Sequence, residues 1–273
     1  MKESGTRRVA VLLDCAAVFT ATLGCVVLVP GSRVGRWESS VLGRPFIEYL
    51  VMLAVPLIVL VAARRYLPSH GLWLGQPSYH FTMGLTAAAP FAAAHAVGFG
   101  VVPGLERWGA FVESGLMLAA LGTVVMLLRN KPSHAAPSAA FVLIPFIGAT
   151  SWHPGHAASA LVFYTLFLAP GEEVLFRGYI QSRLNSGFGC PFTFAGVRWG
   201  WGLVLAAVFF ALFHVLNLPA VAAGELNLQW SMAMPTFVAG LLFGYLREKT
   251  GSIAAGVIVH GLPQGIAWAF LGR

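Results

Sequence analysis

The chain has 273 residues, of which 58% are hydrophobic and 10% are charged, and its mean hydropathy is +0.77. Soluble domains carry about 25% charged residues, so this composition excludes an ordinary soluble protein and predicts a polytopic membrane protein. The formal net charge of +7 would suggest a nucleic-acid partner in a soluble protein. Here the basic residues lie in short loops, where they set membrane topology, and we expect no nucleic-acid partner.

Apolar segments follow one another along the whole chain. A helix needs about 20 apolar residues to cross a bilayer, so the chain has room for about eight such helices. The segment at 139–152 is short and contains Pro145, which leaves open a re-entrant or partly crossing segment, whereas the distribution of basic residues between the loops favours a full crossing. We therefore predict an all-α transmembrane bundle of about eight helices, forming one integral membrane domain over residues 1–273. The candidate spans are 9–30, 46–63, 79–102, 109–128, 139–152, 157–182, 199–217, 233–246 and 252–271.

Two adjacent glutamates, Glu172 and Glu173, lie inside an apolar stretch over residues 158–177. A carboxylate in the bilayer is costly unless something pairs with it, and such residues usually mark a functional site. Glu173 and Arg177 are four residues apart on one helix face and can form an ion pair. Glu172 lies about 100° around the helix, where no local partner is available. It is therefore the candidate general base, although an interfacial charge cluster at a helix end is the alternative.

Pro170 and Gly171 come directly before the two glutamates. A proline inside a helix removes one hydrogen bond and frees the carbonyl four residues back, here that of Leu166. The sequence therefore predicts a locally opened, polar helix beside the carboxylates, which suits a wet cavity at membrane depth.

Two further polar groups interrupt the apolar helices that follow. Phe210 and His214 share one helix face, as do His260 and Gln264. Asn217 follows His214 by three residues and can orient its ring, or can simply end the helix. A lone histidine in a helix is often a hydrogen-bonded core group, but three polar clusters on three apolar helices indicate one site inside the bundle.

These motifs, in this order and at this spacing, resemble those of the CPBP intramembrane proteases, which include the CAAX endopeptidases. The resemblance covers about residues 157–271 and rests on Glu172-Glu173-x-x-x-Arg177, Phe210-x-x-x-His214 and His260-x-x-x-Gln264. It implies a helical bundle with an intramembrane catalytic cavity and hydrolysis of a peptide bond without a metal or other cofactor.

The resemblance also implies a role for each residue. Glu172 would activate the attacking water, assisted by His214. His260 and Gln264 would stabilise the oxyanion, although the family usually has asparagine at the last position. Glu173 and Arg177 would organise the site. We count Phe210 and Asn217 with them, Phe210 from the second motif and Asn217 from its spacing to His214. The substrate would be a membrane-associated protein or peptide that loses a C-terminal tail or a leader, and the composition favours a bacterial inner membrane.

Three alternatives remain open. Glu172, His214 and His260 have the donor atoms of a catalytic zinc site, although the sequence has no His-Glu-x-x-His motif. Proline-broken helices with buried carboxylates are also typical of proton-coupled transporters. A non-catalytic scaffold or immunity protein of the same fold is the third alternative.

Overall fold

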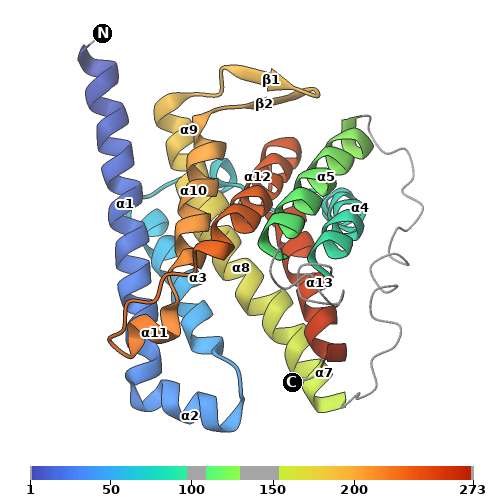
Figure 1. Ribbon diagram of the computed structural model, residues 1–273. Coiled ribbons are helices and arrows are strands. Elements are labelled where there is room, and N and C mark those ends of the chain that lie inside the picture. Colours follow the sequence, from blue (N-terminus) through green and yellow to red (C-terminus); the bar gives the residue numbers. More distant parts are fainter. Residues whose placement is uncertain (1, 97–108, 130–153, 272–273) are drawn as a thin grey trace.

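The structure is a computed structural model that describes residues 2–96, 109–129 and 154–271. These residues are almost entirely helical, which confirms the predicted all-α class (Figure 1). Up to residue 129, the described residues form five α-helices and a short 3₁₀ turn, η1 (Leu67–His70). The α-helices are α1 (Lys2–Gly31), α2 (Arg33–Val41), α3 (Phe46–Ala62), α4 (Pro77–Ala96) and α5 (Gly109–Arg129).

The second half begins with one uninterrupted helical run. It consists of α7 (Pro154–Val162), η4 (Phe163–Leu168), α8 (Ala169–Glu173), η5 (Val174–Gln181) and α9 (Ser182–Phe188). After it come the strands β1 (Phe192–Phe194) and β2 (Val197–Trp199). The remaining helices are α10 (Trp201–Val215), α11 (Leu218–Ala222), η6 (Trp230–Met232), α12 (Ala233–Thr250) and α13 (Ala254–Leu271).

Most of the predicted spans correspond to observed helices. Within the described residues, three helices are long and apolar enough to cross a membrane: 5–31, 109–129 and 155–188. Two shorter apolar helices are α3 and α10. The predicted segment at 139–152 lies outside the described residues, as does the end of the third predicted span.

A small β-hairpin lies between α9 and α10, and an isolated antiparallel bridge joins Leu216 to Leu228. β1 and β2 pair antiparallel, with Phe192 opposite Trp199. The turn between them places Ala195 at φ 50° and Gly196 at φ 75°. Positive φ at both central residues is the geometry of the two-residue turns that match the twist of a hairpin.

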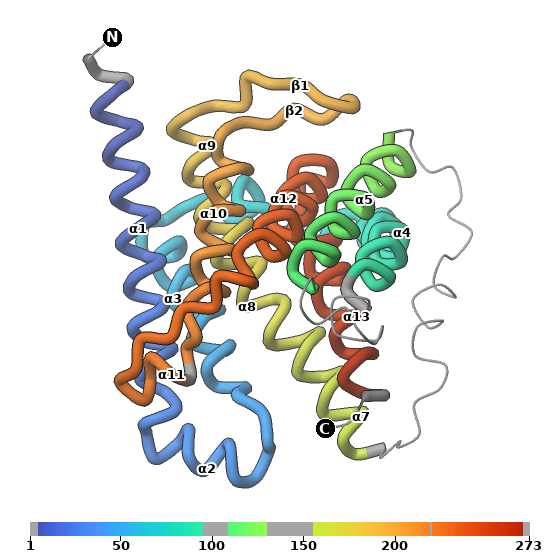
Figure 2. The backbone as a smooth tube through the Cα atoms, in the orientation of Figure 1, coloured from blue at the N-terminus to red at the C-terminus, as the bar shows by residue number. Residues whose placement is uncertain are grey.

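Close helix packing brings the three motif-bearing segments together (Figures 1 and 2). α12 packs along α10, and α13 packs along α4 and against the run from α7 to α8. Glycines allow this approach. A Cβ atom on Gly240 of α12 would lie 3.0 Å from Ala207 of α10, and one on Gly261 of α13 would lie 2.6 Å from the carbonyl oxygen of Tyr164. Small residues are what lets membrane helices pack with their backbones close together.

Candidate active site

The two glutamates lie on a short α-helical segment between two π-helical segments. Residues 163–168 precede this segment and residues 174–181 follow it, and both have the wider π-helical turn. The sequence predicted a locally opened helix around Pro170, and the π-helical turn of 163–168 is the form that this irregularity takes. Such segments occur frequently at functional sites, because the extra residue redirects the side chains beyond it.

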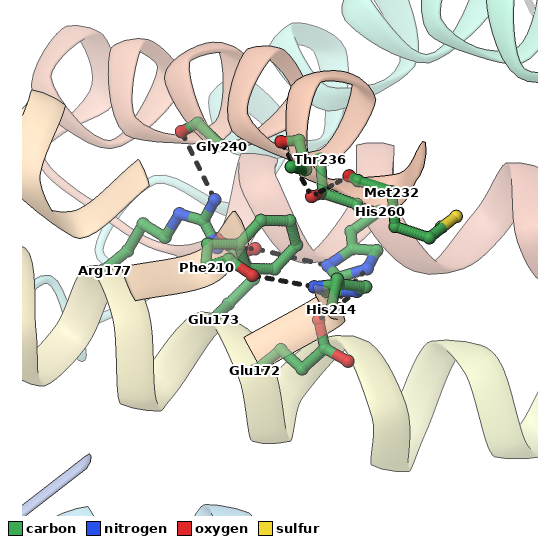
Figure 3. A network of polar contacts seen from close by, with 10 residues as sticks. Glu172, Glu173, Arg177, Phe210, His214, Met232, Thr236, Gly240 and His260 are labelled. Atoms are coloured by element: carbon green, nitrogen blue, oxygen red, sulfur yellow. Dashed lines mark hydrogen bonds and ion pairs between the residues drawn. The ribbon is translucent and has the colours of Figure 1, made fainter. Parts of the chain in front are cut away.

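Glu173 is completely buried and is held on one side by Arg177. Its Oε1 atom lies 3.0 Å from Nη1 of Arg177, so the predicted ion pair is confirmed. Nη2 of Arg177 donates to the carbonyl oxygen of Gly240 on α12 at 3.3 Å. Oε1 of Glu173 also lies 3.3 Å from Nδ1 of His260. Glu173 therefore ties the long helix to α13, and Arg177 ties it to α12 (Figure 3).

Aromatic rings surround the Arg177 guanidinium and the His260 imidazole. The guanidinium carbon lies 4.4 Å from the ring centre of Phe210 and 4.9 Å from that of Phe243. The same Phe243 ring stacks on His260 with the ring centres 4.8 Å apart and an angle of 19°. A cation over an aromatic face is stabilised by the negative face of the ring. These rings therefore help to hold a cation that has no access to solvent.

Glu172 faces the two histidines (Figure 3). Its Oε2 atom lies 3.6 Å from Nε2 of His260 and 3.9 Å from Nε2 of His214. Glu172 and His260 are each 2% exposed, and the side chain of His214 is 23% exposed. Oε2 has no hydrogen-bond partner among the described residues. The structure thus brings one carboxylate and two imidazoles from α8, α10 and α13 to one point.

In both histidine rings, the contact made by Nδ1 fixes which nitrogen carries the proton. Nδ1 of His214 lies 2.9 Å from the carbonyl oxygen of Phe210, which can only accept, so this nitrogen is the donor. Nδ1 of His260 faces the ion-paired carboxylate of Glu173 and is a donor for the same reason. Each neutral ring therefore presents an unprotonated Nε2 to Glu172.

A family model described as Rce1-like, type II CAAX prenyl endopeptidase, matches residues 154–265. This match agrees with the resemblance to the CAAX protease family that the sequence motifs indicated. The matched segment contains the glutamates, both histidines and Gln264. Together with the three long apolar helices, the match indicates an integral membrane protein. Comparison with curated proteins and with solved structures gives no match.

Two of the residues expected in the site, Gln264 and Asn217, do not join the network of contacts around Glu172 and Glu173. Gln264 lies one turn after His260 on α13 and is partly exposed, and no hydrogen bond joins it to another residue in the described part of the chain. Asn217 lies outside the site. Its Oδ1 accepts from the backbone N–H of Ala220 at 3.4 Å, so it caps α11. The expectation that Asn217 orients His214 is therefore corrected, because the carbonyl of Phe210 holds that ring.

Sequence reasoning missed Phe243 and Gly240, which contact the site from α12. The available signal was the spacing of Gly240 and Gly244, which is typical of close helix contact. Within the described ranges, no group of three His, Cys, Asp or Glu residues is arranged to hold a metal ion.

Proposed function

We propose that the protein is an intramembrane endopeptidase in which Glu172 activates a water molecule to hydrolyse a peptide bond. The substrate is a membrane-associated protein or peptide, cut near a C-terminal tail or leader. The observation that carries the proposal is the position of the Glu172 carboxylate opposite two Nε2 atoms, at 3.6 and 3.9 Å. These gaps exceed a hydrogen bond, so a water molecule beside the carboxylate can hydrogen-bond to it and to an imidazole nitrogen without displacing a direct contact.

The proposed reaction begins with this bridging water. Glu172 takes a proton from it as its oxygen attacks the carbonyl carbon of the substrate. His214 assists by accepting a hydrogen bond at Nε2. The carbon–nitrogen bond then breaks, and the proton passes to the leaving amine. A positioned base of this kind contributes about 10²–10⁴-fold to a rate, and the apolar walls strengthen each electrostatic interaction.

The negative charge that develops on the carbonyl oxygen needs hydrogen-bond donors. His260 can donate from Nε2 only as an imidazolium, because its neutral form carries the proton on Nδ1. The Gln264 amide is a donor in any protonation state. The proposed oxyanion site therefore has two donors, of which His260 donates only when protonated and Gln264 always donates. One oxyanion-hole donor typically stabilises the transition state by about 2.7–4 kcal/mol.

The substrate is proposed to enter from the side of His214, which is the most exposed of the three groups. Glu173 acts as a positioning residue because it contacts His260, and Arg177 acts through its ion pair with Glu173. The proposed mechanism uses no metal, and the proposed location is the plasma membrane of a bacterium.

The test compares peptides released from membranes that contain wild-type protein, Glu172→Gln or Glu225→Gln. Glu225 is an exposed loop residue, so its substitution makes the same chemical change away from the site. Co-expression with the products of neighbouring genes supplies candidate substrates, and mass spectrometry reads the cleavage products. We expect Glu172→Gln to lower product formation by about 100-fold or more, and Glu225→Gln to match wild type. Identical peptide patterns for all three proteins would refute the proposal.

A further inference from the structure

A cavity with a cationic lining lies at the end of the molecule where α2 joins α3 and α7 begins. It encloses about 690 Å³, and its polar lining comes from Arg44, Tyr49, His156, Ser159, Tyr164 and Trp268. Glu172, His214 and His260 do not line this cavity, although Leu168, one turn before Glu172, contributes to its wall. This end of the molecule is opposite the N-terminus, with α2 lying across the lower end of α1 (Figure 2).

Arg44 supplies a positive charge that the described residues do not neutralise. Its Nη2 atom lies 3.4 Å from Nε2 of His156. Its guanidinium lies over the rings of Phe163 and Tyr164, at 5.8 and 5.6 Å. Rings of this kind hold a cation without cancelling its charge. In the described part of the chain, no carboxylate lies within ion-pair distance of Arg44, so the cavity suits an anion.

An apolar groove adjoins this cavity. It encloses about 470 Å³, and Leu42 and Ser159 line both spaces. Its walls include Trp37, Val162 and Phe167. The groove also contains the carboxylate of Glu38, but Oε1 of this residue accepts the backbone N–H of Ile47 at 2.8 Å. The two spaces together match a molecule that joins an anionic group to an apolar chain.

The surroundings indicate a membrane interface. α2 exposes Val34, Trp37 and Val41 at 54%, 56% and 60%, and it also carries Arg33 and Arg36. A short helix with exposed apolar side chains and basic residues typically lies in the plane of the interface, where headgroups meet acyl chains. A cavity beside such a helix is within direct reach of the lipids.

We propose that Arg44 binds the phosphate of an anionic phospholipid and that the adjoining groove holds one of its acyl chains, while His156 lines the site with its Nε2 atom held 3.2 Å from the carbonyl oxygen of Trp268. The guanidinium matches the geometry of a phosphate and can bind two of its oxygens at once. The hydroxyl groups of Ser159 and Tyr164 can donate to the same phosphate. This site is independent of the hydrolytic function proposed for Glu172.

The experiment measures lipid retained by the full chain. Protein in bilayer discs of phosphatidylcholine, with or without a minority of phosphatidylglycerol, is released into mild detergent and examined by native mass spectrometry. Arg44→Gln removes the proposed phosphate ligand. Val162→Trp fills the groove and leaves Arg44 in place. Arg33→Gln is the matched control, because it removes the same charge from the same interface outside the cavity. Thermal unfolding in detergent identifies any variant that fails to fold.

We expect wild type and Arg33→Gln to retain one phosphatidylglycerol in preference to phosphatidylcholine. Arg44→Gln should lower that retention by about tenfold or more, as expected for the loss of a charge-assisted contact. Val162→Trp should lower it by about as much, because the acyl chain loses the apolar groove that it would occupy. Equal losses in Arg33→Gln and Arg44→Gln would overturn the proposal, since they would mean diffuse attraction to the interface.

Two other anions are tested in parallel. Arg44-dependent binding of inorganic phosphate, with lipid retention unaffected by Val162→Trp, would show a free-ion site and overturn the proposal. The second is an apolar peptide, compared with a free C-terminal carboxylate and with a C-terminal amide. The proposal would also be overturned if Arg44 were needed to bind the carboxylate form alone while Arg44→Gln retained as much lipid as wild type. That result would assign the cavity to a peptide.

Discussion

Gly256 of α13 leaves space for the carboxylate of Glu173 on the long helix. A Cβ atom at position 256 would lie 2.7 Å from Oε2 and 3.3 Å from Cδ of Glu173. The other carboxylate oxygen is fixed by Arg177 and His260. Because both contacts use Oε1, the carboxylate has little freedom to turn away from an added methyl group.

Gly256→Ala should therefore displace Glu173 and, through it, the His260 ring. We expect a loss of stability of about 1–3 kcal/mol, as for other overpacked interiors, and a fall in cleavage activity of about tenfold or more if His260 stabilises the oxyanion. Thermal unfolding in detergent and the rate of peptide cleavage measure the two effects.

The control for this substitution is Gly115→Ala. Gly115 lies within α5, and a Cβ atom there would meet nothing within 4 Å. This variant should retain the unfolding temperature and activity of wild type. If Gly256→Ala behaves in the same way, the close approach of α13 to Glu173 has no part in positioning the site.

The contacts that could be predicted from the sequence are those within one helix. The Glu173–Arg177 pair follows from a spacing of four residues. Pro170 predicted an irregular helix beside the glutamates, and the structure has π-helical turns on both sides of them. The convergence of Glu172 with His214 and His260 required three separate motifs. The spacing alone singled out Glu172 as the candidate general base, and the resemblance to a known family assigned roles to the two histidines.

The contacts that could not be predicted depend on how two helices are placed relative to each other. Phe243 stacks on His260, and Gly240 accepts a hydrogen bond from Arg177, because α12 lies beside both partners. Asn217 was misplaced for a local reason. The prediction assumed that the helix of His214 continues, whereas α10 ends at Val215, so the three-residue offset no longer puts both side chains on one face.

The buried ion pair makes a prediction about stability. Arg177→Met leaves the Glu173 carboxylate buried without its cation, which typically costs about 3–5 kcal/mol. The double variant Glu173→Gln/Arg177→Met removes both charges and should be more stable than the Arg177→Met single variant. Unfolding free energies of the wild type, the two single variants and the double variant give the coupling energy directly. Strictly additive losses would show that the two side chains do not stabilise each other.

Gln264 offers a test of the proposed oxyanion site. If its amide donates to the developing oxyanion, Gln264→Leu should lower kcat by about 10²–10³-fold. The change in KM should be small, because the contact forms mainly in the transition state. Gln264→Asn keeps the amide on a shorter side chain and should lose less than Gln264→Leu. Wild-type kcat in Gln264→Leu would leave His260 as the donor and remove Gln264 from the mechanism.

Removal of metal ions separates the glutamate mechanism from a zinc mechanism that uses the same three residues. Glu172, His214 and His260 have the chemical types of a catalytic zinc set, and zinc binds such ligands at about 2.0–2.2 Å. A glutamate base acting alone predicts that cleavage persists at an unchanged rate after prolonged treatment with a strong chelator, and that the active protein contains far less than one zinc per chain. Glu172→Gln abolishes activity under either mechanism, so it does not distinguish them. Activity that disappears with the chelator and returns on adding zinc would assign Glu172 to metal binding, and the proposed role as a base would then be wrong.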